Sequence, residues 1–165
     1  MTTKATEQFE KPRFENRDAF LIGGFQGHFS DPPREIPTLW QRFAPHIGRV
    51  PSQVGPVAYG VVLSLSKDGS CDYIAGVEVS DLSLLSAEFA QLSIPAHRYA
   101  IFDHPEHVSK LGETIGAIWN KWLPGSGVEL AHDPKGTPAL FERYGEAFNP
   151  QEGKGDVEVW VPVKG

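Results

Sequence analysis

Two stretches near the C-terminus alternate between apolar and polar residues with the period of two that is typical of β-strands. They are residues 138–148 and 156–163, and both are rich in Phe, Tyr, Trp and Val. Because successive side chains of a strand point to opposite faces, Val157, Val159 and Val161 share one face, which we expect to lie in the core. The pattern therefore predicts a C-terminal hairpin with one buried face.

The polar residues of this hairpin form two pairs of an acid and an aromatic ring. Glu158 and Trp160 share the face opposite the three valines, and Glu142 and Tyr144 share one face of the preceding strand. A carboxylate beside aromatic rings suits an organic cation, because the rings make cation–π contacts and the acid supplies the counter-charge. The alternative interpretation is an ordinary hairpin whose polar face is solvated.

The rest of the chain predicts the same order of elements twice, namely strand, helix, strand and strand. Alternation predicts the other strands over residues 18–25, 57–66, 73–80 and 98–102. Apolar stripes at helical spacing predict helices through residues 36–43 and 111–122, and Leu-Pro-Gly-Ser-Gly at 123–127 ends the second. Trp119 lies on the second stripe, where core packing and a place in a ligand groove are both open.

The two halves also match residue by residue at an offset of about 80 residues, which indicates an internal duplication. His28 corresponds to His107, for example, and Glu78 to Glu158. We therefore expect an α+β fold in which two pseudo-symmetric βαββ repeats form an antiparallel sheet, with helices on one side and a central ligand groove. Glu78 and Glu158 would lie equivalently at this groove, unless Glu78 is a plain surface acid.

This duplication sets the expected domain organisation. Residues 1–17 carry no periodic pattern and are interpreted as an N-terminal tail, followed by one domain over residues 18–164. Within that domain, repeat one covers about 18–80, a connector 81–97, and repeat two about 98–164. A chain of 165 residues is long enough for such a domain to bury a sizeable core.

Charge and composition narrow the choice of partners. The net charge is −6, which argues against a nucleic-acid-binding surface and favours cationic partners. Cys71 is the only cysteine, so no disulfide can form within the chain. No apolar run approaches membrane-spanning length and the N-terminus lacks a signal-peptide core, so we expect a cytoplasmic protein that does not bind membranes.

The densest cluster of potential metal ligands is the sequence His104-Pro-Glu-His. Its spacing differs from the HExxH motif of zinc proteases, and a zinc deaminase would need a Cys-x-x-Cys pair that this chain lacks. We expect these histidines to lie at a strand-to-helix turn, and we predict neither a metal site nor a cofactor.

Four segments of the second half, taken in order, resemble a known family. They are Tyr99-Ala-Ile-Phe-Asp-His, Trp122-Leu-Pro-Gly-Ser-Gly, Phe141-Glu-Arg-Tyr and Val157-Glu-Val-Trp-Val-Pro-Val-Lys. Over residues 18–164 the chain resembles the GyrI-like effector-binding domain, which also forms the C-terminal drug-sensing half of AraC-type and MerR-type transcription regulators. The resemblance implies a groove in which a buried glutamate ringed by aromatic residues binds amphipathic, often cationic, small molecules.

The resemblance also implies roles for particular residues. Glu142 corresponds to the glutamate of the Phe-Glu-x-Tyr strand, and Glu158 with Trp160 to the Glu-x-aromatic pair of the last strand. Tyr144 would lie beside Glu142, and an unpaired Glu142 should have a raised pKa because of desolvation. Weaker candidates for the groove, placed by the repeat and not by a motif, are Tyr59, Phe25, Trp119 and Glu78.

The predicted function is therefore multidrug-type binding of cationic or aromatic small molecules, with Glu142 as the counter-charge. The alternative is an enzyme, because some relatives resemble hydrolases that open strained rings of alkylating compounds, and Glu142 could act as general base. A third possibility, inhibition of a partner protein, follows from the family name alone. Only about 17 residues precede the first predicted strand, too few for a helix-turn-helix module, so we expect a stand-alone domain that does not contact nucleic acid directly.

Overall fold

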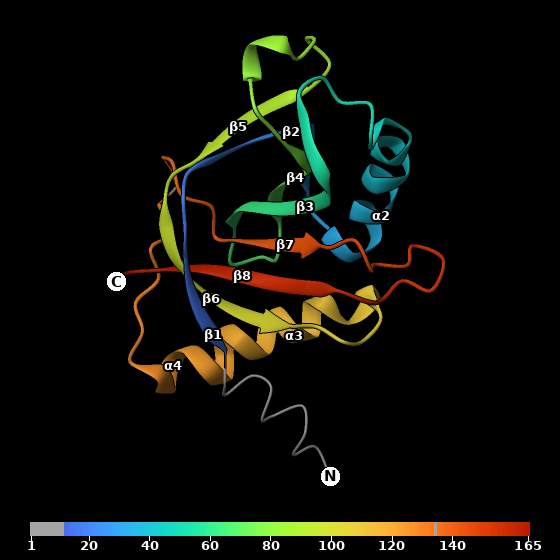
Figure 1. Ribbon diagram of the computed structural model, residues 1–165. Coiled ribbons are helices and arrows are strands. Elements are labelled where there is room, and N and C mark those ends of the chain that lie inside the picture. The colour runs from blue at the N-terminus through green and yellow to red at the C-terminus, as the bar shows by residue number, and fades with distance from the viewer. Residues whose placement is uncertain (1–11, 134) are drawn as a thin grey trace.

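The structure is a computed structural model that describes residues 12–133 and 135–165. In this part of the chain, eight strands form one antiparallel sheet in the order β1-β6-β8-β7-β3-β4-β2-β5 (Figure 1). The strands are β1 (Arg13–Arg17), β2 (Phe20–Phe29), β3 (Gln53–Leu65), β4 (Cys71–Val79), β5 (Ala90–Ile94), β6 (His97–Asp103), β7 (Leu140–Tyr144) and β8 (Val157–Val163).

One helical segment lies in each half of the chain. α2 (Pro32–Phe43) follows β2, and α3 (Leu111–Ala117) follows β6. A π-helical turn, Ile118–Trp122, joins α3 to α4 (Leu123–Ser126), so the second helix runs into the predicted stop and ends at Gly127, the last residue of that stop, whose φ is 73°. None of the described helices is long and apolar enough to cross a membrane. Short 3-10 turns lie at Ala44–His46, Leu82–Leu84 and Val108–Lys110.

Local sequence explains where α2 begins and which side of it is buried. Proline occupies its first turn, where the N–H that proline lacks would have no helical partner. Leu39 and Phe43 lie one helical turn apart and are 3% and 0% exposed. α2 therefore packs on the sheet through a single apolar stripe.

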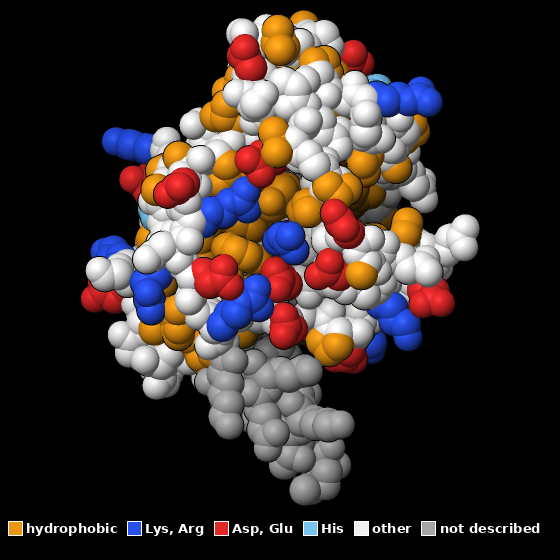
Figure 2. Space-filling view, viewed as in Figure 1, with side chains coloured by type: hydrophobic (Ala, Val, Ile, Leu, Met, Phe, Trp, Pro, Cys, Tyr) orange, Lys and Arg blue, Asp and Glu red, His pale blue; other side chains and the backbone are white. Residues whose placement is uncertain are grey.

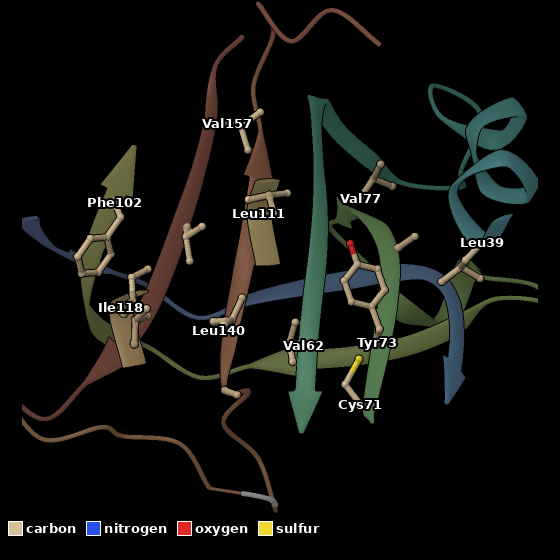
Figure 3. Packing of buried hydrophobic residues seen from close by; sticks show 14 of the residues in the cluster. Leu39, Val62, Cys71, Tyr73, Val77, Phe102, Leu111, Ile118, Leu140 and Val157 are labelled. Carbon is tan, nitrogen blue, oxygen red and sulfur yellow. The ribbon is translucent and has the colours of Figure 1, made fainter. Parts of the chain in front are cut away.

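The sheet has two faces with different coverings. α2 and α3 pack on the same face, here called the helix face, and share one hydrophobic cluster with it. In Figure 3, Leu39 reaches from α2 towards Tyr73, whereas Ile118 lies beside Phe102 and Leu111 lies between Val157 and Leu140 in this view. The opposite face, here called the second face, carries a separate cluster made of Phe20, Ile22, Tyr59, Val61, Ile74, Ile94, Tyr99, Ile101, Phe141 and Trp160.

This architecture confirms the expected fold class. The described residues form an α+β domain in which two helical segments lie on one side of an antiparallel sheet. The first half contributes β2, α2, β3 and β4, and the second half contributes β6, α3, β7 and β8 in the same order. The strands β3 and β7, one from each half, pair with each other and join the two halves at the middle of the sheet.

Two edge strands correct the sequence interpretation. β1 lies within the predicted tail and pairs with β6, whereas the tail up to residue 11 lies outside the described residues. β5 lies within the predicted 81–97 connector and pairs with β2. β1 reads Arg-Phe-Glu-Asn-Arg and most of its side chains are exposed, so it offers no apolar alternation, and pairing with β6 defines it as a strand.

Candidate functional site

The strand register places Glu142 on the helix face. In β7, Glu142 is paired with Gly60 of β3 on one side and with Val159 of β8 on the other. Directly paired residues of antiparallel strands point to the same face, so the Glu142 carboxylate lies on the side that carries α2 and α3. Glu142 is only 7% exposed, although it is an acid at the centre of the sheet.

Three aromatic side chains surround this carboxylate. Tyr73 and Tyr144 each donate a hydrogen bond from the hydroxyl to Glu142 Oε1, both at 2.7 Å. Trp40 Nε1 in turn donates to the Tyr73 hydroxyl at 3.0 Å. We call these four residues the Glu142 cluster. Because Trp40 and Tyr73 come from the first half and Glu142 and Tyr144 from the second, both halves of the chain build it.

Gly60 leaves the space that this cluster occupies. A Cβ atom at position 60 would overlap both the Tyr73 hydroxyl and Glu142 Oε1. Glycine weakens the interior of a strand, and here it also lets two polar atoms approach the β3 backbone closely. The Glu142 cluster therefore depends on the absence of a side chain at Gly60.

The Glu142 carboxylate has no cationic partner within the described residues, where every ion pair involves another acid. Burial raises the pKa of Glu142, and the hydrogen bonds from Tyr144 and Tyr73 oppose that shift only in part. Burial followed by the nearby Glu142 charge raises the pKa of both tyrosines, so both stay protonated donors. The site is thus an acid held by neutral donors, without a counter-charge.

An aromatic wall leads from the cluster to the surface. The Tyr144 ring packs edge-on against Trp40, with 5.3 Å between the ring centres, and against Phe148 at 5.0 Å. Beside Tyr144 lies an open depression of about 450 Å³, a volume within the range of small-molecule sites. Its lining is Ile47, Pro56, Ala58, Tyr144, Gly145, Glu146, Phe148 and Pro150.

Two weaker candidates, Phe25 and Trp119, also lie on the helix side. Phe25 packs against Phe43, His46 and Phe89 with ring-centre distances of 5.4, 5.0 and 5.6 Å. Its strand, β2, is separated from β7 by β3 and β4, so Phe25 belongs to the layer under α2. Trp119 is half-buried on the π-helical turn and packs against the helix-face cluster.

The expectation that Glu142 and Glu158 face the same groove is wrong. Glu158 is paired with Arg143, the neighbour of Glu142 in β7, so its side chain leaves the second face. Tyr59 and Trp160 belong to the hydrophobic cluster of that same face. Glu78 is paired with Ile22, which belongs to this cluster too, so Glu78 also points to the second face. The structure thus divides the predicted ligand residues between two sides of the sheet.

On the second face, the acids Glu158 and Glu78 form ion pairs with arginines of the chain itself. Arg13 Nη2 donates to Glu158 Oε2 at 2.7 Å, and Trp160 Nε1 donates to the other carboxylate oxygen at 2.9 Å. Arg17 Nη2 donates to Glu78 Oε1, and its Nη1 donates to the Tyr59 hydroxyl, both at 2.9 Å. Each acid-and-aromatic pair therefore already contains a cation, unlike the Glu142 cluster.

Sequence reasoning missed Tyr73, Trp40 and Gly60 as members of the site. Tyr73 shares its face of β4 with Ala75 and Val77, and a tyrosine in such an apolar series needs a partner for its hydroxyl. This need for a hydrogen-bond partner is the feature of the sequence that could have identified Tyr73. Trp40 lies on the apolar stripe of α2, a position that by itself predicts core packing. Only the register of β4 under α2 brings its indole N–H to the Tyr73 hydroxyl.

His104 and Cys71 are buried within the fold. His104 lies between β6 and α3, as predicted, and its ring bonds to Thr114 Oγ1 at 2.8 Å and to the His107 carbonyl at 2.9 Å. Among residues 12–133 and 135–165, no group of three or more potential ligands is placed to hold a metal ion. Burial raises the pKa of Cys71 to about 11, which leaves it a protonated thiol.

A buried carboxylate among aromatic rings on an α+β sheet is the arrangement that the resemblance to a small-molecule-binding domain implied. In agreement, the family model of the GyrI-like small molecule binding domain matches residues 10–164. The chain therefore belongs to the GyrI-like family, as its motifs had indicated.

Individual proteins are similar to this chain in sequence or in structure. The transcriptional regulator BrlR of Pseudomonas aeruginosa is 29% identical over 153 residues, which cover 92% of this chain and 54% of BrlR. The chain thus spans about half the length of this curated relative. The structure of SAV2435 bound to tetraphenylphosphonium is similar, with a TM-score of 0.69, 16% identity and 94% of both chains covered. The EcmrR C-terminal domain gives a TM-score of 0.64 at 16% identity, covering 93% of this chain and 97% of that one.

Proposed function

We propose that this domain binds amphipathic aromatic cations on the helix face, with Glu142 as counter-charge and Tyr73, Tyr144 and Trp40 as aromatic walls. The observation that carries the proposal is the buried Glu142 carboxylate, which has two hydroxyl donors and no basic partner among the described residues. An ionised acid buried without a cation costs free energy. A bound cation would recover part of that cost.

The surroundings of Glu142 favour a ligand with an apolar aromatic body. Tyrosine and tryptophan rings attract cations through their faces, and this attraction grows when the pair is shielded from water. The depression beside Tyr144 is lined mainly by apolar side chains, which suits rings and not a small hydrated ion. The similar protein SAV2435 has been solved with tetraphenylphosphonium, a cation of this kind, which supports the choice of probe.

A titration with tetraphenylphosphonium tests the proposal. Binding is followed by calorimetry and by tryptophan fluorescence, for the natural protein and for Glu142→Gln, which keeps the shape of the side chain and removes its charge. We expect saturable binding, weakened about 30-fold or more in Glu142→Gln, because a buried charge pair loses one partner. The matched control is Glu158→Gln on the second face, which should bind as the natural protein does.

Two results would contradict the proposal. One is equal affinity of Glu142→Gln and the natural protein for tetraphenylphosphonium. The other is equally tight binding of triphenylphosphine oxide, a neutral molecule of similar shape. The hydrolase alternative uses the same carboxylate, so the incubation is repeated with an epoxide, and formation of a diol that is lost in Glu142→Gln would favour the enzyme.

A further inference from the structure

The second face holds a buried hydroxyl without a hydrogen-bond partner. Tyr99 of β6 is 0% exposed, and within the described part of the chain its hydroxyl is the one buried side-chain polar atom that bonds to nothing. Leaving a buried hydroxyl unpaired costs free energy, and native structures rarely do so without a reason. An unpaired buried hydroxyl of this kind indicates that a hydrogen-bond acceptor is missing beside it.

Tyr59 and Arg17 lie beside this hydroxyl. The rings of Tyr99 and Tyr59 both pack edge-on against the Phe141 ring, at 5.3 and 5.5 Å between centres. Burial raises the pKa of Tyr99 to about 12. The Arg17 charge lowers this pKa to a smaller extent, and Tyr59 raises it to a smaller extent. Tyr99 and Tyr59 thus contact the same Phe141 ring, and Arg17 bonds to Tyr59.

Tyr59 also keeps a hydrogen that it can donate. Its oxygen accepts a bond from Arg17 Nη1 at 2.9 Å, so its own O–H points elsewhere, and no acceptor for it lies among the described side chains. Tyr99 and Tyr59 thus bring two unused phenolic donors to one part of the second face. Two such donors can both bond to a single carbonyl oxygen, which has two lone pairs.

Tyr99 and Tyr59 lie beneath the surface, at 0% and 3% exposed. Figure 2 shows a depression in the middle of the molecule, with hydrophobic side chains at its floor and acidic and basic side chains around its rim. The aromatic cluster of the second face supplies stacked rings, since Phe141 and Trp160 lie nearly parallel at 5.4 Å between centres. Arg17 lies over the Phe20 ring at 3.6 Å and bonds to Glu78 and to the Tyr59 hydroxyl, so its side chain covers Phe20.

Charges around this hollow are balanced in pairs. Glu78 is 2.9 Å from Arg17, and Glu158 is 2.7 Å from Arg13 and 3.7 Å from Arg143. Among the ion pairs that the described residues form here, each of these acids already has a basic partner, whereas the two phenolic donors remain unused. The hollow therefore favours a neutral ligand over a charged one.

We propose that the second face binds a neutral aromatic molecule that carries a carbonyl group. Its oxygen accepts hydrogen bonds from the Tyr99 and Tyr59 hydroxyls, and its rings pack in the hollow against Trp160 and the Arg17 guanidinium, which stays paired with Glu78. This site lies on the opposite side of the sheet from the Glu142 cluster and takes ligands of a different charge class. It does not depend on cation binding at Glu142.

Benzophenone is a suitable probe, because it has two rings, one carbonyl and a photoreactive ketone. Binding is measured by calorimetry for the natural protein and for Tyr99→Phe, which keeps the ring and removes only the hydroxyl. We expect about fivefold weaker binding in Tyr99→Phe, the effect of one neutral hydrogen bond. Diphenylmethane, which lacks the carbonyl, should bind both proteins equally, and Glu142→Gln should bind benzophenone normally.

Irradiation of the bound probe locates the site by peptide mapping. Cross-links within β3, β6 or β8 support the proposal, and cross-links confined to α2 or to the loop after β7 overturn it. Equal affinity of Tyr99→Phe and the natural protein for benzophenone, or no binding up to the solubility limit, also overturns it. Because Glu142→Gln and Tyr99→Phe affect different probes, failure of this site is distinguishable from failure of the cation site.

Discussion

Glu142 and Glu158 lie on adjacent strands one position out of register, so their carboxylates leave opposite faces of the sheet. Glu158 is paired with Arg143, and Glu142 with Val159. Among the described residues, Glu158 bonds to Arg13, whereas the Glu142 side chain bonds only to two tyrosine hydroxyls. Two acids that look equivalent along the sequence therefore differ in the property that matters for binding a cation, which is whether a cation is already present.

The substitution Glu142→Gln should stabilise the ligand-free protein increasingly as the pH rises. The pKa of Glu142 in the folded protein is raised above the ordinary value of 4.5, so ionisation is harder in the folded than in the unfolded chain. Its contribution to stability is fully present below about 4.5 and is lost as the pH rises through the folded-state pKa. Thermal unfolding between pH 4 and 8 measures the difference, about 2–4 °C for each kcal/mol.

Glu158→Gln is the control for this prediction. Its carboxylate bonds to Arg13 and to the Trp160 indole, so removing the charge should lower the melting temperature slightly at neutral pH. A melting-temperature difference between Glu142→Gln and the natural protein that stays constant from pH 4 to 8 would show that Glu142 does not titrate across this range.

Affinity for a permanently charged aromatic cation should fall as the pH is lowered. Tetraphenylphosphonium keeps its charge at every pH, so only the protein titrates. The proposed site needs ionised Glu142, and below the pKa of Glu142 affinity should fall by up to about tenfold per pH unit. Calorimetric titrations at several pH values measure this slope, and a flat profile that matches Glu142→Gln would remove Glu142 from the site.

Tyr73→Phe should destabilise the protein more than Tyr144→Phe. Both substitutions remove a 2.7 Å hydrogen bond to Glu142 Oε1, but only Tyr73 also accepts a bond from the Trp40 indole. We expect a loss of about 1–2 kcal/mol for Tyr73→Phe, since the indole N–H loses its acceptor. Chemical denaturation of both variants gives the comparison, and a larger loss in Tyr144→Phe would contradict the assigned network.

Much of the fold could be predicted from the sequence because its central strands and helices have strong periodic patterns. The valines of β8 and the apolar stripe of α2 each bury one side, so alternation and helical spacing reveal them. β1 could not be found in this way. Its five residues are mostly exposed, and its pairing with β6 depends on a contact between distant segments.

The site could be predicted only in part, for a related reason. Alternation correctly placed Glu142 and Tyr144 on one face of β7, but it could not say which face of β7 matches which face of β8. The register decides that, and it separates Glu142 from Glu158. The ion pairs of Arg17 and Arg13 were also invisible, because both arginines lie in the segment that appeared to be a tail.

Arg17→Gln should leave cation binding at Glu142 unchanged and create a second, weaker cation site. Arg17 bonds to Glu78 and lies over the Phe20 ring, so its removal frees an acid beside aromatic rings. The side chains of this pair are 21% and 27% exposed, so stability should fall by no more than about 1 kcal/mol. Calorimetry with tetraphenylphosphonium should change from one site to two, and loss of the tight site would contradict the separation of the two faces.

Gly60→Ala should disrupt the Glu142 cluster although it adds only one methyl group. A Cβ atom at position 60 overlaps the Tyr73 hydroxyl and Glu142 Oε1, so both side chains must move and their hydrogen bond must lengthen or break. Overpacking of this kind costs about 1–3 kcal/mol, and binding of tetraphenylphosphonium should weaken at the same time. Gly112→Ala is the matched control, because Gly112 is an exposed position of α3 and nothing lies within 4 Å of its added Cβ. Alanine favours a helix over glycine by up to about 1 kcal/mol. If Gly60→Ala bound the cation as tightly as Gly112→Ala does, the space at Gly60 would have no part in shaping the site.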